Sequence, residues 1–233
     1  MAEPDAWHRP SRLLFALEAP RAALEFAALA AAWPVVARAP RGDGHGVLLL
    51  PGFLTTDTST LPLRQLLRRL GHTPYGWDLE RNLGPTAAVV RGLPRRLQNL
   101  HEATGRPVSL VGVSLGGVFA RRLARDHPGV VRQVVTLGSP FRPREEGLPP
   151  LPVPSTAIYT RGDGIVGWRS CLDREGPTSE NVEVPGSHCG LGHNPIAVRV
   201  VTDRLAQPEG TWQPFDPPPQ TGHQPAGAAR WSR

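Results

Sequence analysis

Apolar runs alternate with amphipathic stretches along most of the chain. Short apolar runs that are typical of buried strands occur at residues 46–50, 72–77, 108–113, 130–137, 156–160 and 181–184. Apolar residues at helical spacing predict helices at 61–70, 86–103, 115–127 and 195–205. This alternation favours an α/β domain, with an open, mostly parallel sheet and helices on both faces. Right-handed crossovers would bring the carboxyl ends of the strands to one edge, where such sheets bind ligands.

Both ends of the chain depart from this pattern. Residues 1–40 contain two predicted helical pieces, 12–18 and 20–33, which we expect to pack on a catalytic domain formed by residues 41–206. Residues 207–233 are rich in Pro, Gly and Gln, and are predicted to be a disordered or loosely draped tail. The apolar stretch 26–37 ends near a small-residue pattern, so a signal peptide or anchor, with export or membrane association, is an alternative.

Charge and length favour the packed helix over that alternative. Glu18, Arg21 and Glu25 lie in or beside the apolar stretch. The stretch is also shorter than the roughly 20 residues that span a bilayer. We therefore expect a helix on the domain, or one in peripheral contact with a membrane surface, in a cytoplasmic protein.

Composition narrows the possible partners. All 26 basic residues are arginine, and the formal net charge is +6. The arginines are scattered, with no nucleic-acid motif, so no nucleic-acid partner is predicted. The histidines and cysteines have no metal-ligand spacing, and no phosphate loop follows a strand. We expect neither a metal nor another cofactor, and no obligate protein partner is evident.

The junction after the predicted strand 108–113 reads Gly112-Val113-Ser114-Leu115-Gly116. A Gly-x-Ser-x-Gly segment between a strand and a helix is typical of a nucleophile elbow, in which a tight turn projects the serine from the sheet edge. A Cβ at Gly112 or Gly116 is expected to collide with neighbouring backbone. Ser114 is therefore the candidate nucleophile.

A nucleophilic serine needs a base, and the base needs an acceptor that orients it. Asp163 and His188 follow the predicted strands 156–160 and 181–184, so both belong to the edge that carries the elbow. Asp173 and His193 are the alternative acid and base. The other histidines that flank predicted elements are expected at the surface: His45, His72, His101 and His127.

Two backbone N–H groups would complete the site as an oxyanion hole. One is expected from Leu115, at the start of the elbow helix, where free N–H groups favour an anion. The other is expected from Phe53, with Leu54 as the next candidate, because Gly52 would let this loop approach closely. Alternatively, Pro51-Gly52 is a simple turn.

Four segments together resemble the α/β-hydrolase superfamily, particularly its small lipases and esterases. They are the elbow, Leu-Gly-Ser-Pro-Phe at 137–141, Gly-Asp-Gly-Ile-Val at 162–166, and Gly-Ser-His-Cys-Gly-Leu at 186–191. The resemblance covers residues 46–205, and implies Ser114 as nucleophile, Asp163 as acid and His188 as base. Larger relatives insert a helical cap after the strand corresponding to 130–137. Here only the Pro- and Gly-rich stretch 141–154 fills that place, so we expect a minimal cap or none.

A shallow apolar cleft should then bind the substrate. Its predicted walls are Phe53, Leu54, Leu115, Phe141, Ile165, Val166, Trp168 and Leu191. Ile165 and Leu191 have an alternative place in the core. These residues favour a carboxylester hydrolase, an esterase or lipase, acting on a small or lipid-like ester through an acyl-enzyme. A thioesterase, amidase or acyltransferase with the same triad, and a non-catalytic binding protein, are the alternatives.

The two cysteines adjoin the predicted acid and base loops. Cys171 follows the loop of Asp163, and Cys189 is next to His188. Either they are ordinary thiols, or a disulfide joins the two loops, which would indicate an oxidising compartment.

Overall fold

The computed structural model describes residues 10–216, and these residues contain a six-stranded parallel sheet. The strands are β1 (Gly46–Leu50), β2 (Thr73–Gly76), β3 (Val108–Val113), β4 (Val131–Leu137), β5 (Ser155–Tyr159) and β6 (Ser179–Glu183). They are arranged in the order β2-β1-β3-β4-β5-β6, with every neighbouring pair parallel. The predicted open parallel sheet is confirmed. The part of the predicted tail from 217 to 233 lies outside the described residues.

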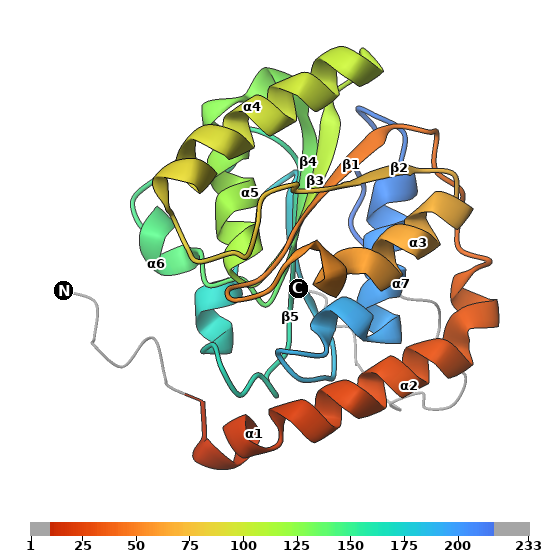
Figure 1. Cartoon of the computed structure of the whole chain (residues 1–233), viewed down its shortest axis with the longest axis vertical. Helices are drawn as coiled ribbons and strands as arrows, with labels where there is room; N and C mark the ends of the chain where they lie inside the picture. The colour runs from red at the N-terminus through yellow and green to blue at the C-terminus, as the bar shows by residue number, and fades with distance from the viewer. Residues whose placement is uncertain (1–9, 217–233) are drawn as a thin grey trace, which may run out of the picture.

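Helices cover both faces of the sheet (Figure 1). One face carries α4 (Ala87–Thr104) and α5 (Leu115–Asp126), while the other carries α3 (Leu61–Arg69), α7 (Pro195–Ala206) and part of α2 (Glu18–Val36). The alternation of strand side chains creates two cores. In β1, Val47 and Leu49 pack in the core with α3 and α7, while Leu48 and Leu50 pack in the core with α4 and α5. This explains why β1 is apolar and buried along its whole length.

Local signals set several helix ends. The Thr86 hydroxyl accepts a hydrogen bond from the N–H of Val89 at the start of α4, and Gly105 ends that helix with a φ of 65°. Asn194 caps α7 in the same way through Ile196 and Ala197. The N-terminal pieces differ slightly from the prediction, since α1 spans Arg12–Ala16 and α2 continues to Val36 with Pro34 inside it.

The strand order reverses between β1 and β3. The chain moves outward from β1 to β2, and then returns to place β3 on the other side of β1. The loops that follow β1 and β3 therefore diverge at the carboxyl edge, and this is where open α/β sheets form ligand crevices. The strand order alone therefore predicts a ligand crevice beside Gly52, Phe53 and Ser114.

The N-terminal helices lie along this carboxyl edge, drawn in red in Figure 1. Helix α2 packs against α7 and the short 3-10 helix η5 (Leu191–His193). Helix α1 lies on the loop after β5, where the backbone of Leu14 leaves no room for a Cβ at Gly164. Within residues 10–216, no helix combines the length and apolar character that crossing a membrane requires.

Candidate active site

Ser114 occupies a strained backbone position between β3 and α5. Its φ is 51° and its ψ is −121°, a combination that non-glycine residues rarely adopt. Its N–H donates to the carbonyl of Leu137 at 2.8 Å, which holds the turn against β4. A Cβ at Gly112 would collide with the backbone of Gly117, and one at Gly116 with the carbonyl of Leu50. The predicted requirement for both glycines is confirmed.

The three residues expected to form a triad lie in one line of hydrogen bonds. The Ser114 hydroxyl is 3.0 Å from Nε2 of His188, and Nδ1 of His188 is 2.6 Å from Oδ2 of Asp163. Oδ1 of Asp163 accepts hydrogen bonds from the N–H groups of Ile165 and Val166 at 2.8 and 2.6 Å. The carboxylate therefore keeps one oxygen for the imidazole, which makes Nδ1 the protonated nitrogen and leaves Nε2 to accept the serine proton.

The alternative acid and base have other partners. Asp173 is buried in a bidentate ion pair with Arg121, at 2.6 and 3.0 Å, and also accepts from the hydroxyl of Ser155. The ring of His193 packs edge-on against Phe26, with 5.5 Å between the ring centroids. Neither residue is bonded to Ser114 or His188 among residues 10–216. The geometry therefore favours Asp163 and His188.

Two backbone N–H groups beside Ser114 are available to an anion. Leu115 is the first residue of α5, so its N–H has no acceptor within the helix. The N–H of Phe53 likewise has no acceptor among the described residues, whereas Leu54 donates to the carbonyl of Asn82 at 2.7 Å. The side chain of the fully buried Asn82 also donates to the carbonyl of Pro51. Asn82, which sequence analysis did not identify, thus fixes the loop that presents Phe53.

Three charged residues of α2 hold the acid and base loops in place. Arg21 donates to the carbonyls of Gly162, at 2.8 Å, and of Gly186. Glu25 accepts from the N–H and the hydroxyl of Ser187, both at 2.7 Å. Glu18 accepts from backbone N–H groups in both loops. The spacing of these charges in the sequence places them on one face of a helix, but it does not indicate their partners.

Glu18 makes the most direct contact with the triad backbone. Its Oε1 accepts from the N–H groups of Gly164 at 2.7 Å and of His188 at 3.0 Å, while Oε2 accepts from Cys189 at 2.8 Å. Burial alone would raise the pKa of Glu18, but these hydrogen bonds and the nearby His188 outweigh it. The pKa of Glu18 consequently lies below its ordinary value of 4.5, and the group is a buried carboxylate at neutral pH.

A cleft of about 300 Å³ lies next to the elbow, and its lining is mostly apolar. Leu115, Val118 and Phe119 of α5 form one wall, and Phe141 and Leu148 contribute to the other. Of the predicted walls, only Leu115 and Phe141 belong to this cleft. Val118 and Phe119 were missed, because the helical pattern of α5 suggested packing rather than binding. Leu148, in the Pro- and Gly-rich segment between β4 and β5, was also missed.

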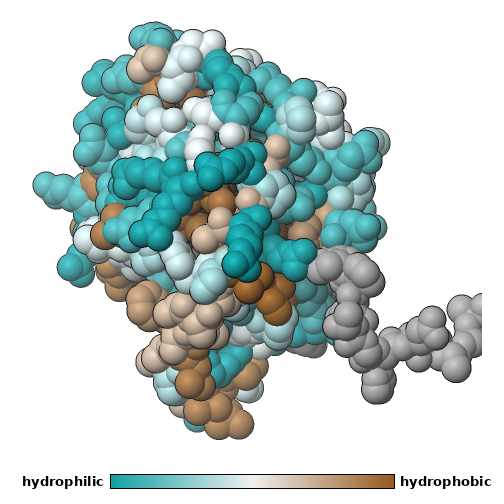
Figure 2. Space-filling model, turned by 90° about the vertical axis from the view of Figure 1, so that its right-hand side faces the viewer, coloured by the Kyte–Doolittle hydropathy of each residue, from teal (hydrophilic) through white to brown (hydrophobic). Residues whose placement is uncertain are grey.

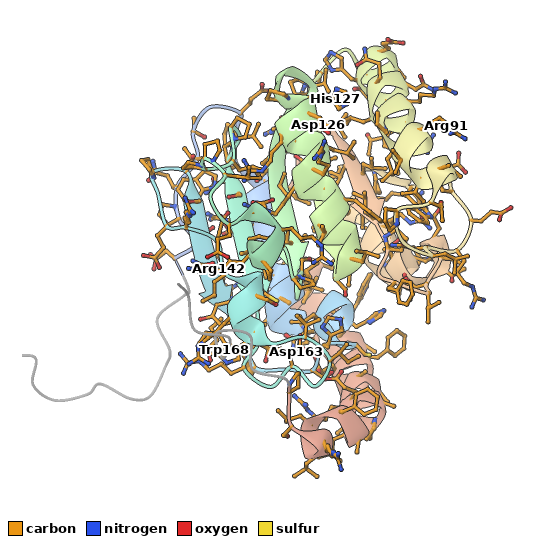
Figure 3. All side chains as sticks on the ribbon, turned by 90° about the vertical axis from the view of Figure 1, so that its left-hand side faces the viewer. Arg91, Asp126, His127, Arg142, Asp163 and Trp168 are labelled. Atoms are coloured by element: carbon orange, nitrogen blue, oxygen red, sulfur yellow. The ribbon has the colours of Figure 1, made fainter. Side chains whose placement is uncertain are left out.

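The other predicted wall residues lie elsewhere around the site. Phe53, Leu54 and Ile165 are exposed, and Val166 is half-buried in the acid loop. Leu191 is fully buried in the core, as the alternative prediction for this residue had it. There it approaches Gly138 beside the triad. Trp168 stacks on Tyr159 and contacts the guanidinium groups of Arg161 and Arg169, and therefore lies outside the cleft. Figure 3 shows Trp168 and Asp163 at the same edge, opposite Asp126 and His127.

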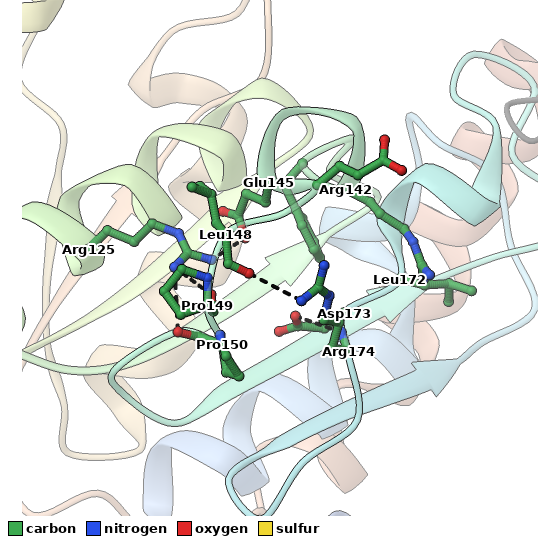
Figure 4. Close-up of a pocket in the computed structure, with 11 residues that line it drawn as sticks. Arg125, Arg142, Glu145, Leu148, Pro149, Pro150, Leu172, Asp173 and Arg174 are labelled. Carbon is green, nitrogen blue, oxygen red and sulfur yellow. Dashed lines mark hydrogen bonds and ion pairs between the residues drawn. The ribbon is translucent and has the colours of Figure 1, made fainter. Parts of the chain in front are cut away.

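The segment between β4 and β5 forms the outer wall of the cleft. It contains one short helix, α6 (Arg142–Glu145), followed by the prolines at 149 and 150. Glu145 pairs with Arg121 and Arg125, each at 2.7 Å, and Arg125 also donates to the carbonyl of Pro149 (Figure 4). Arg174 donates to the carbonyl of Leu148 at 3.2 Å. Arginines thus fix this short segment in the place where a cap would stand.

The structure has Cys171 and Cys189 as free thiols, so the alternative of a disulfide between the loops was wrong. Cys171 is buried in η4 (Trp168–Cys171), whereas Cys189 is exposed. Burial raises the pKa of both thiols, and that of Cys189 reaches about 11, with Glu18 contributing. The hydrogen bonds from α2, rather than a disulfide, join the acid and base loops.

A second Ser–His–Asp arrangement lies at the opposite edge of the sheet. Nε2 of His45 is 2.8 Å from the Ser109 hydroxyl, and Nδ1 is 2.5 Å from Asp43. Ser109 and His45 are buried, as is His72, whose ring packs edge-on against His45. The expectation that His45 and His72 lie at the surface was wrong, because the two rings pack against each other and are buried. A buried serine cannot meet a substrate, so this set is structural.

Comparison with known proteins identifies the fold. No family model matches the chain, and no curated protein matches its sequence. Among solved structures, it is similar to lipase B of Aspergillus fumigatus, with a TM-score of 0.58 and 16% identity over 73% of this chain and 55% of the other. It thus spans about half the length of that lipase. The mature lipase BlEst2 of Bacillus licheniformis matches with a TM-score of 0.58 and 14% identity over 73% and 95% of the two chains.

A third similar structure, the pyrethroid hydrolase PytH, has a TM-score of 0.54 and 15% identity over 72% of this chain and 99% of the other. At these identities, the likeness concerns the fold. The protein therefore has the α/β-hydrolase fold, in agreement with the sheet order and with the superfamily resemblance of its sequence.

Proposed function

We propose that the protein is a serine hydrolase that cleaves carboxylic esters through an acyl-enzyme on Ser114. The observation that carries this proposal is the line of hydrogen bonds from Ser114 through His188 to Asp163, beside two free N–H groups. A binding protein with this fold would have no need for such an arrangement. The names of the similar structures, two lipases and a pyrethroid hydrolase, agree with the proposal.

The first half of the proposed reaction transfers the acyl group to the enzyme. Ser114 Oγ forms a bond to the carbonyl carbon while its proton moves to Nε2 of His188. Asp163 accepts the hydrogen bond of Nδ1–H, and so stabilises the imidazolium. The negative carbonyl oxygen binds the N–H groups of Phe53 and Leu115. The bond to the alcohol oxygen then breaks, and Nε2 returns the proton to that oxygen, releasing the alcohol.

The second half of the proposed reaction restores the enzyme. Water attacks the acyl carbon as Nε2 of His188 accepts one of its protons. The bond between the acyl carbon and Ser114 Oγ breaks, and the imidazolium returns the proton to the serine. The products are a carboxylic acid and the free enzyme. No step needs a metal or a redox group.

The cleft beside Leu115 favours a substrate with an apolar acyl group, which the cleft would bind. Its lining by Leu115, Val118, Phe119 and Phe141 buries apolar atoms favourably. Its volume of about 300 Å³ suits a short or medium chain better than a large polymer. A panel of nitrophenyl esters of increasing chain length, together with thioesters and amides, would distinguish an esterase from the alternative acyl-transfer enzymes.

The decisive experiment compares two serine variants. Ser114→Ala should lose labelling by a fluorophosphonate probe, and should lower kcat for the best ester by about 10⁴-fold or more while still unfolding cooperatively. Ser109→Ala is the matched control, because Ser109 belongs to the buried Ser–His–Asp set. It should keep labelling and activity. If Ser114→Ala kept more than about a tenth of the activity, the proposed mechanism would be wrong.

A further inference from the structure

The amino-terminal half of helix α2 turns its charged side chains toward the protein, whereas Leu29 and Val36 of its carboxyl-terminal half are buried in the core. Its three charged side chains, Glu18, Arg21 and Glu25, are buried or half-buried against the acid and base loops. A surface helix normally turns its apolar side toward the protein and its charges toward water. The opposite arrangement leaves the outer face of α2 without the groups that water solvates.

The outer face of α1 and α2 is entirely apolar. From Leu13 to Val35, the exposed residues are Leu, Phe, Ala, Pro and Val only. The larger ones are strongly exposed, at 68% for Leu13, 65% for Phe15 and 70% for Leu24. Figure 2 shows the resulting brown surface at the lower end of the molecule, where α1 and α2 lie. A contiguous apolar surface of this kind indicates a binding face.

Arginines flank this apolar face at both ends. Arg12 is exposed at the start of α1, and Arg38 and Arg41 are exposed just beyond the end of α2. Within residues 10–216, none of the three pairs with a carboxylate. Because Glu18 and Glu25 are engaged on the inner face, the outer face combines apolar side chains with positive charge only.

We propose that this face docks on an anionic lipid bilayer, with α1 and α2 lying in its headgroup region. The apolar side chains enter the boundary with the acyl chains, and Arg12, Arg38 and Arg41 contact lipid phosphates. The inner face of α2 is bonded to the loops of Asp163 and His188, so docking holds the carboxyl edge of the sheet near the lipid surface.

The charges favour a bilayer over a second copy of the chain. Two copies related by a two-fold axis would pair this face with itself, either parallel or antiparallel. Since both ends are positive, either pairing brings arginines against arginines, with no acidic partner on the exposed face. An anionic bilayer complements both ends at once.

The test measures binding to vesicles, and it can be made with Ser114→Ala, so its result does not depend on the proposed catalysis. Neutral phosphatidylcholine vesicles are compared with vesicles containing phosphatidylglycerol. Leu24→Glu adds one charge at the centre of the docking face. Val90→Glu is the matched control, because Val90 is 58% exposed on α4, beside Arg91, which Figure 3 shows far from the N-terminal helices. Sedimentation velocity of each protein reports its oligomeric state.

We expect the protein to bind the anionic vesicles, and Leu24→Glu to weaken that binding by about tenfold or more. Val90→Glu should bind like the parent. Replacing Arg12 and Arg38 with Gln should weaken binding by about fivefold for each arginine, while the same change at Arg91 and Arg95 of α4 should have a smaller effect. Figure 3 shows Arg91 far from the N-terminal helices.

Three results would overturn the proposal. They are an absence of binding to anionic vesicles, equal losses for Leu24→Glu and Val90→Glu, and a stable dimer that Leu24→Glu dissociates. The last result would assign the face to a second copy of the chain. Far-ultraviolet circular dichroism and thermal unfolding verify that the two Glu variants are folded. We expect both to fold, because both substituted positions are exposed.

Discussion

Glu18→Gln offers a sharp test of how the N-terminal helix supports the catalytic loops. The substitution keeps the size and shape of the side chain, and removes its charge. If the amide oxygen replaces Oε1, it still accepts from the N–H groups of Gly164 and His188. The amide nitrogen then replaces Oε2 and faces the N–H of Cys189, which donated to the carboxylate at 2.8 Å. Two donors would face each other in a buried place.

The expected cost follows from these contacts. Hydrogen bonds to a charged group contribute roughly 1.5–3 kcal/mol each, and a buried donor without a partner costs about 1–3 kcal/mol. Glu18→Gln weakens two such bonds and breaks the third, so the free energy of unfolding should fall by about 2–4 kcal/mol. Because domains are stable by about 5–15 kcal/mol, the variant should still fold. The backbone of His188 would lose its anchor, and kcat should fall by about 10- to 100-fold.

The assay combines urea unfolding with steady-state kinetics on a soluble nitrophenyl ester. Glu18 is a positioning residue that does not contact the substrate cleft, so kcat should fall while KM changes little. Glu209→Gln is the matched control, because Glu209 is exposed and its side chain makes no hydrogen bond or ion pair among the described residues. A Glu18→Gln variant within about 0.5 kcal/mol of wild type, with kcat unchanged, would refute the reasoning.

Acidification adds an independent check. The pKa of Glu18 is lowered in the folded protein, so its contribution to stability is complete above the ordinary value of 4.5. It is lost as the pH falls through the lower, folded-state pKa. The stability difference between wild type and Glu18→Gln should therefore be constant near neutral pH and narrow below about pH 4.5. A difference that widened on acidification would contradict the assignment of a buried carboxylate.

Two further predictions concern histidines. His188→Ala should abolish ester hydrolysis, whereas His193→Ala should retain most of it, because His193 packs against Phe26 and not against the triad. An inactive His193→Ala variant together with an active His188→Ala variant would reverse the assignment of the base. Burial lowers the pKa of His72 to about 4, and its ring nitrogens have no partners among residues 10–216. The unfolded chain therefore binds a proton below about pH 6.5 that the folded protein does not, so stability should fall from pH 6.5 to 4, by up to about 3 kcal/mol. His72→Leu should remove that part of the loss in urea unfolding, and an unchanged pH slope would count against it.

The nucleophile elbow could be predicted from the sequence alone. Gly112, Ser114 and Gly116 are close in the chain, and the strand and helix around them have strong hydrophobic patterns. The order of strands and helices also predicted that Asp163 and His188 would lie at the same edge as Ser114. These conclusions depend on local sterics and on the handedness of crossovers, which are the same in every chain of this type.

Choosing among equivalent side chains required the tertiary structure. Asp163 and Asp173 are both plausible acids in the sequence. The structure separates them, because Asp163 bonds to His188 whereas Asp173 pairs with Arg121. The role of Glu18 was equally hidden, because its partners are Gly164, His188 and Cys189, more than a hundred residues away. Hydrogen bonds across such separations leave no periodic pattern in the chain.

The burial of side chains could likewise be predicted only in part from the sequence. Periodicity placed the apolar residues of β1 and β3 correctly, since a strand between two helical layers has no polar face. It failed for His45 and His72, which precede strands. His45 is buried where it bonds to Asp43 and Ser109, and His72 is buried with its ring edge-on against that of His45. The sequence determined which elements form and which edge bears the chemistry. The tertiary structure decided which charges are paired and which face of α2 is exposed, because those outcomes depend on neighbours that are distant in the chain.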